Sequence, residues 1–181
     1  MAHAGEVIEH PIFRHRATFI RTAADTDGEL LELQFTIGPG GPRLLPHIHR
    51  LQLEQFEMLD GSLQFSIAGR RLDRARGERV EVPPGISHSF HNVTSVPAGF
   101  RVVYRPALRL EDYFTALYAL GAAGNVNRQG FPNPLWLAVL MSDFPDEFFY
   151  LPQIPWWLQR ALAAPLTLMG RLLGYRSAKL M

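Results

Sequence analysis

The first part of the chain alternates apolar and polar positions over short stretches, as strands with one buried face do. In the clearest case, residues 30–37, one face holds Leu31, Leu33, Phe35 and Ile37. Similar stretches recur as far as about residue 105, and turn-forming sequences rich in Gly, Pro and Asp separate them. Many short strands at this spacing predict a β-sandwich or a β-barrel.

The pattern becomes helical after about residue 108. Residues 113–120 predict a short helix that ends at Gly121. Asn133 is a candidate N-cap for a second helix, because Pro134 follows it at the first helical position. We therefore expect a β-domain over residues 1–108 and an α-helical C-terminal extension over residues 109–181.

A last helical stretch covers about residues 155–174, and Pro165 is expected to divide it or to begin a further helix. The stretch is almost entirely apolar and begins with Trp156 and Trp157. So wide an apolar face needs burial. It has three possible partners: the mouth of the β-domain, a second copy in a homodimer, or a membrane surface, where Trp and Arg are favoured.

The composition is that of an ordinary folded protein, with 47% apolar and 19% charged residues among 181. A formal charge of +1 predicts no nucleic-acid partner. The absence of cysteine excludes disulfides, thiolate catalysis and cysteine-ligated zinc. The first residues lack the pattern of a secretory signal, and no run of about 18 apolar residues occurs, so we expect a cytoplasmic protein.

Four side chains from two separate stretches form a candidate metal site. His47 and His49 point to the same side of a strand, about 7 Å apart. Glu54 has the wrong parity for a straight strand, so the chain must bend between His49 and Glu54. His88 comes from a distant strand, after a Pro-Pro-Gly turn. Three imidazoles and one carboxylate are a ligand set for a first-row transition metal with open coordination positions.

These residues lie in two motifs by which the chain resembles the cupin superfamily. The first falls on Gly41, His47, His49, Glu54 and Gly61, and the second on Gly77, Pro83, Gly85, His88 and Asn92. The resemblance implies a mainly β fold, a double-stranded β-helix of the jelly-roll type, before the helical extension. It also implies that His47, His49, Glu54 and His88 bind one divalent ion, which could be Fe, Mn, Ni, Cu, Co or Zn.

The sequence around Glu54 and His88 looks most like single-domain, quercetin-dioxygenase-like cupins. That resemblance suggests a dioxygenase acting on a chelating, enol- or phenol-like small molecule. Glu54 would be a catalytic base as well as a ligand, or a structural ligand alone. A non-redox isomerase or lyase and a non-catalytic binding module are the alternatives. The candidate substrate-pocket residues are Met58, Phe65, Phe90, Tyr104 and Arg43.

Overall fold

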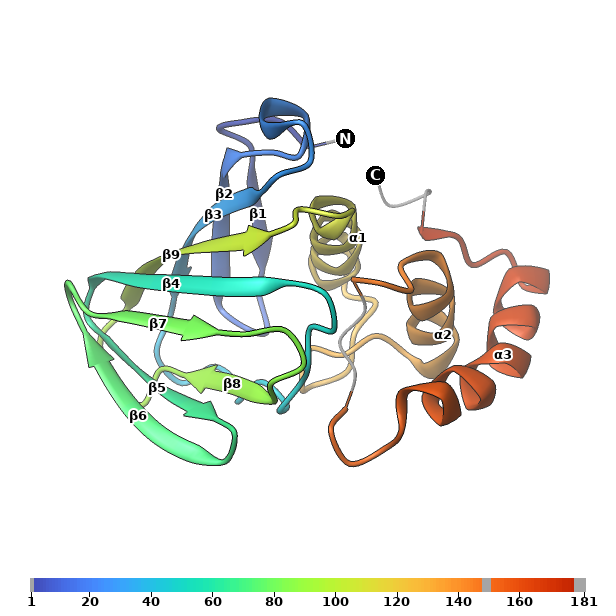
Figure 1. Cartoon of the computed structure of the whole chain (residues 1–181). Coiled ribbons are helices and arrows are strands. Elements are labelled where there is room, and N and C mark those ends of the chain that lie inside the picture. The colour runs from blue at the N-terminus through green and yellow to red at the C-terminus, as the bar shows by residue number, and fades with distance from the viewer. Residues whose placement is uncertain (1, 148–150, 178–181) are drawn as a thin grey trace.

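The strands of the chain form two antiparallel sheets that face each other (Figure 1). The structure is a computed structural model and describes residues 2–147 and 151–177. The larger sheet has the order β1-β2-β3-β9-β4-β7, and the smaller sheet has the order β6-β5-β8. The strands are β1 Val7–His10, β2 His15–Arg21, β3 Leu31–Ile37, β4 Leu53–Asp60, β5 Ser62–Ile67, β6 Arg70–Ala75, β7 Arg79–Val82, β8 His88–His91 and β9 Ala98–Arg105.

The core lies between the two sheets and consists of the alternating apolar residues that the sequence places on one face. Strand β3 pairs with β9 in a register that sets Phe35 opposite Phe100, and their rings stack 5.2 Å apart. Phe56 on β4 and Phe65 on β5 meet edge to face across the core. These buried rings supply much of the apolar area whose removal from water stabilises the sandwich.

Gly61 shows why the first motif ends in glycine. It turns the chain from β4 to β5 with a φ of 63°, in the left-handed region that favours glycine. A Cβ at this position would lie 2.7 Å from the carbonyl oxygen of Pro97. The turn therefore needs both the backbone freedom and the missing side chain.

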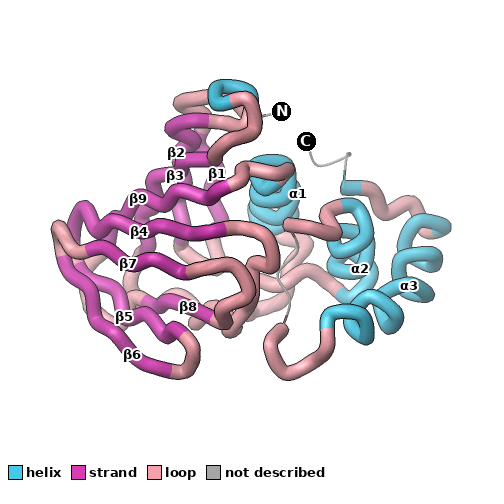
Figure 2. Tube along the Cα trace, viewed as in Figure 1, coloured by secondary structure: helices cyan, strands magenta, loops and turns pink. Residues whose placement is uncertain are grey.

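Three helices follow the strands: α1 Leu110–Ala122, α2 Pro134–Asp143 and α3 Trp156–Leu172. Asn133 caps α2 as expected, because its side chain accepts hydrogen bonds from the backbone N–H groups of Leu135 and Trp136. Helix α1 packs against β1, and α3 packs against α2. Figure 2 shows strands on one side of the molecule and α2 and α3 on the other, with α1 between them.

The expectation that Pro165 divides the last helical stretch is wrong. Helix α3 runs without interruption from Trp156 to Leu172, with Pro165 inside it. Proline removes the hydrogen bond to the carbonyl four residues earlier, which here belongs to Ala161. Both Pro165 and Ala161 lie on the exposed side of the helix, where a carbonyl that loses its partner remains accessible to solvent.

The predicted jelly-roll fold with a helical C-terminal extension is thus confirmed: a β-sandwich of two antiparallel sheets is followed by three helices. Among the described residues, no helix combines the length and the apolar character needed to cross a bilayer.

Candidate metal centre

Backbone hydrogen bonds hold the two motif segments side by side. The amide of His47 donates to the carbonyl of His88 at 2.9 Å, and the amide of His88 donates back to the carbonyl of His47 at 2.9 Å. The amide of Gly85 donates to the carbonyl of His49 at 2.8 Å. Backbone hydrogen bonds alone, without a metal ion, therefore join residues about forty positions apart in the sequence into one frame.

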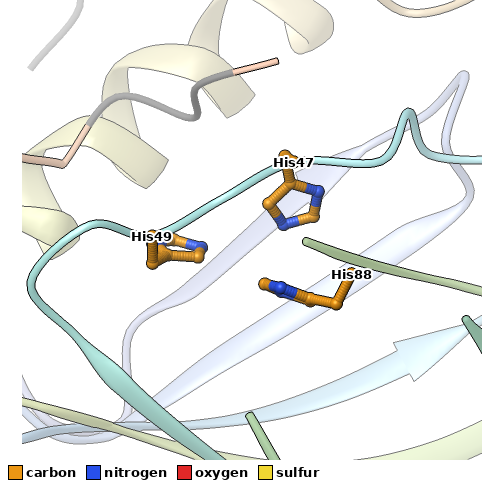
Figure 3. A group of neighbouring side chains, drawn as sticks. All are labelled: His47, His49 and His88. Carbon is orange, nitrogen blue, oxygen red and sulfur yellow. The ribbon is translucent and has the colours of Figure 1, made fainter. Parts of the chain in front are cut away.

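The side chains of His47, His49 and His88 converge within this frame (Figure 3). The nitrogen atoms that these rings offer lie within 4.8 Å of one another, and all three residues are buried. A bend at Arg50 and Leu51 then brings the chain into β4, as the parity of Glu54 requires.

Each of the three imidazoles has its Nδ1 fixed by an acceptor on the side away from the cluster. Nδ1 of His47 lies 2.9 Å from the carbonyl oxygen of Leu45, and Nδ1 of His88 lies 3.1 Å from that of Ile86. A carbonyl oxygen only accepts, so each Nδ1 carries the ring proton. In a neutral ring, Nε2 is then left with a lone pair.

Gln52 fixes the third ring in the same way. Its Nε2 donates to the carbonyl oxygens of Pro106 at 3.0 Å and Ala107 at 3.1 Å, so its Oε1 faces Nδ1 of His49 at 3.1 Å. Nδ1 of His49 must therefore donate to Oε1. Orienting partners of this kind set the tautomer of metal-binding histidines.

Glu54 completes the cluster from β4. Its Oε1 lies 3.1 Å from Nε2 of His49 and 3.0 Å from Nε2 of His88, and all three side chains are nearly inaccessible to solvent. Donor atoms in adjacent positions around one octahedral ion lie about 3 Å apart when each bond is about 2.1 Å long. The spacing around Glu54 fits that arrangement.

The charges of these groups also suit a cation. Burial, together with the neighbouring imidazoles of His88 and His49, lowers the pKa of His47 to about 3, so this ring is neutral. Burial raises the pKa of Glu54, but His49 and His88 outweigh that effect and lower it to about 2. Burial lowers the pKa of His88, but Glu54 outweighs it and raises the net value. In the metal-free protein the buried carboxylate of Glu54 therefore shares a proton with His88, and a metal ion that displaced this proton would supply the positive charge that the carboxylate needs.

The residues therefore fit a single metal ion. Neutral imidazoles and an ionised carboxylate are the forms in which these side chains bind metals. The described part of the chain brings His47, His49 and His88 together as a buried triad compatible with one ion, and Glu54 lies against two of them.

The metal centre opens into a cavity of about 410 Å³ between the sandwich and the helices. His47 and Glu54 form part of its wall. Six phenylalanines line it, Phe13, Phe35, Phe90, Phe100, Phe114 and Phe131, together with Tyr104, Tyr113 and Tyr118, and further apolar residues come from all three helices. The extension therefore covers the mouth of the sandwich and contributes a large part of the cavity wall.

The pocket residues named from the sequence occupy different places. Phe90 and Tyr104 line the cavity. Met58 and Phe65 are buried in the core and are not part of the lining, because their side chains pack between the sheets. Arg43 is exposed and does not line the cavity either.

Sequence reasoning missed a second polar position in the cavity. His15 and Tyr118 both line it, and Nδ1 of His15 lies 3.4 Å from the hydroxyl oxygen of Tyr118. Burial lowers the pKa of His15 to about 3, so this imidazole is neutral. The parity of β2 could have revealed it, because His15 shares an inner face with Ala17 and Phe19.

A comparison with protein families supports the fold and the site together. Residues 33–104 match the family described as Cupin domain, a range that includes His47, His49, Glu54 and His88. This match covers less than half of the chain, and the buried triad of histidines lies within the matched range. No curated protein matches the sequence.

Solved structures with the same fold are diverse. A predicted oxalate decarboxylase from Thermotoga maritima is 19% identical with a TM-score of 0.50, and the match covers 57% of this chain and 92% of that one. The polyketide cyclase RemF from Streptomyces resistomycificus is 20% identical with a TM-score of 0.49, over 58% and 78%. A sugar phosphate isomerase from Silicibacter pomeroyi is 23% identical with a TM-score of 0.45, over 52% and 60%. At 19% identity, the match to the Thermotoga maritima structure concerns the fold alone.

Proposed function

We propose that this cupin is a metal-dependent dioxygenase that acts on a lipophilic, enol- or phenol-like substrate. One observation carries the proposal: the carboxylate of Glu54 and the imidazole of His47, both in the metal centre, line a large cavity with many aromatic residues in its wall. Such a cavity suits a flat apolar molecule that presents a chelating oxygen at one end. The resemblance of the motif sequences to quercetin-dioxygenase-like cupins agrees with this substrate class.

His47, His49, Glu54 and His88 would hold the ion. When bound, a divalent transition metal supplies Lewis acidity and open positions for a substrate oxygen and for dioxygen. The donor atoms alone do not determine whether Fe, Mn, Ni, Cu, Co or Zn is bound, because the concentration of each metal in the cell also decides this.

The residues of the chain provide the remaining functions. The phenylalanine side chains of the cavity wall exclude water and orient an aromatic substrate against the metal centre. The carboxylate of Glu54 is ionised and lies in the cavity wall, where it can accept a proton from an enol or a phenol. Tyr104 stays protonated, because burial raises the pKa of its hydroxyl group well above the usual value.

The proposal is tested by oxygen consumption. The metal-free protein is loaded with Fe²⁺, Mn²⁺, Ni²⁺ or Cu²⁺ and given a panel of flavonols and enolised diketones, and we expect oxygen uptake with at least one pair. His88→Ala should abolish it, whereas His91→Ala, on the same strand β8 but outside the cluster, should not. Silence across the panel from fully loaded protein contradicts the proposal.

A non-redox isomerase or lyase is the second candidate, and the position of Glu54 favours it. A carboxylate in the cavity wall beside the metal centre could move a proton on a substrate without any oxidant. Turnover of the same panel by the Zn²⁺-loaded protein without oxygen would support this reaction. Tight binding of a panel compound with no turnover under either condition would instead indicate a binding module.

A further inference from the structure

Helix α3 buries polar side chains and exposes apolar ones, which is the reverse of a helix on a water-exposed surface. Its polar residues Gln159 and Thr167 are buried: Gln159 bonds the backbone of Leu151, and the hydroxyl of Thr167 donates to the carbonyl of Ala138 at 2.9 Å. Its outer side is apolar instead. A soluble monomer normally shows the opposite arrangement.

The outer side of α3 is a continuous apolar face. Trp157, Leu168 and Leu172 are 60%, 64% and 79% exposed, and with Ala161 and Ala164 they recur every three or four residues. We call these five residues the α3 face. Large exposed apolar side chains gathered on one element mark an interaction site.

The charges that α3 itself carries are all positive. Residues 151–181 contain no Asp or Glu. Arg160 and Arg171, three turns apart on the same edge of the helix, border the α3 face, and only Arg171 has an acidic partner in the described residues, at Asp143. A second copy packed face to face would bring like charges together with no carboxylate on this face to offset them.

We propose that the α3 face binds an anionic lipid surface. Apolar side chains with an exposed Trp, flanked by Arg, form the pattern of a helix that lies in the interface of a membrane. Apolar burial and the attraction of arginine for anionic headgroups then act together. The proposal concerns the surface and does not depend on which reaction the metal centre performs.

The residues at the rim of the cavity connect the proposed membrane contact with ligand entry. Leu45, Ile154 and Leu162 both line the cavity and are exposed, so its opening is apolar. Leu162 belongs to α3 itself. A lipophilic ligand dissolved in the bilayer would therefore meet an apolar entrance on the same helix that contacts the lipid.

Flotation of the full-length protein with lipid vesicles tests the proposal. We expect binding to vesicles of phosphatidylcholine mixed with phosphatidylglycerol, and weaker binding to phosphatidylcholine alone or at high salt. The double variant Leu168→Glu/Leu172→Glu should bind the mixed vesicles at least about tenfold less. The matched control Val93→Glu/Val96→Glu alters exposed apolar residues in the loop between β8 and β9, and it should bind the mixed vesicles as the wild type does.

Metal content and circular dichroism of each variant show whether it is folded, which is expected because all four side chains are exposed. Sedimentation of the same samples measures self-association. Wild-type protein that ignores both kinds of vesicle overturns the proposal. A second result also overturns it: the wild-type protein is a dimer that does not bind lipid, and Leu168→Glu/Leu172→Glu dissociates that dimer. The partner of the α3 face is then a second copy of the chain.

Discussion

In the metal centre, each of the three imidazoles is oriented by an acceptor that bonds its Nδ1 atom, on the side of the ring away from Nε2. The carbonyls of Leu45 and Ile86 and the amide of Gln52 leave the Nε2 atoms to face the cavity side of the frame. Gln52 differs from the other two acceptors, because a side chain can be replaced without altering the backbone. It therefore allows the orientation of one ligand to be tested separately.

We expect Gln52→Ala to lower the affinity for a divalent metal by about 10- to 100-fold, because His49 loses the acceptor that fixes its tautomer and ring position. Competition with a fluorescent chelator measures the affinity. Gln55→Ala is the control, since Gln55 lies three residues further on, in β4, and bonds the exposed Glu81. Equal losses in the two variants would contradict the orienting role.

The coupling between Glu54 and His88 predicts a pH effect in the metal-free protein. Because Glu54 raises the pKa of His88, this histidine keeps a proton that an incoming ion must displace, and metal affinity falls as the pH decreases. The pair stabilises the metal-free fold below the ordinary histidine pKa, and this contribution is lost as the pH rises through the raised pKa of His88.

Glu54→Gln should therefore lower the titration midpoint of His88 in the metal-free protein, as followed by nuclear magnetic resonance of the imidazole protons. Glu57→Gln, on the same strand but paired with Arg79, should leave the midpoint unchanged. A His88 midpoint that is the same in wild type and Glu54→Gln would show that the carboxylate does not set it.

At the scale of elements, the glycine at the β4–β5 turn is constrained both by its backbone conformation and by its neighbours. Gly61→Ala adds a Cβ to a left-handed backbone against the carbonyl of Pro97, whereas Gly69→Ala adds one at a φ of 80° with nothing within 4 Å. The left-handed conformation alone costs about 1–2 kcal/mol for alanine. We expect urea unfolding to show a loss of about that size for Gly69→Ala and a clearly larger loss for Gly61→Ala. Equal losses would mean that the contact with Pro97 relaxes freely.

The sandwich could be predicted from the sequence because alternation in strands such as β3 reports which face is buried, and the pattern is local. His47, His49 and His88 could be predicted because their spacing follows the two motifs. The role of Gln52 could not, since its amide is fixed by carbonyls 54 and 55 residues away. The continuous course of α3 through Pro165 depends on which side of the helix faces solvent, and sequence periodicity alone does not give that.

At the scale of the whole molecule, the helices form the side of the cavity opposite the metal centre. His15 and Tyr118 come together there from positions 103 residues apart. The parity of β2 places His15 on the inner face, but no local pattern pairs it with Tyr118, because their contact depends on how α1 packs against the sandwich. The size of the cavity likewise follows from the packing of α1, α2 and α3.

Narrowing the cavity from the helical side should weaken ligand binding without affecting the metal. Ala163 on α3 lines the cavity, so Ala163→Phe should reduce the affinity of the metal-loaded protein for quercetin at least about tenfold, measured by the absorbance of the flavonol. Ala161→Phe, on the exposed side of the same helix, is the control. Metal stoichiometry should match the wild type in both. Equal quercetin affinity in the two variants would place the ligand elsewhere.

The donors and much of the cavity wall come from different stretches of the chain: His47 to His88 supply the donors, and residues 113–166 supply the helical wall. Mutations in the wall can therefore accumulate while the ligand shell stays intact. Single substitutions at wall positions such as Leu137 or Met141 would therefore change which compounds fit the cavity without altering the metal donors.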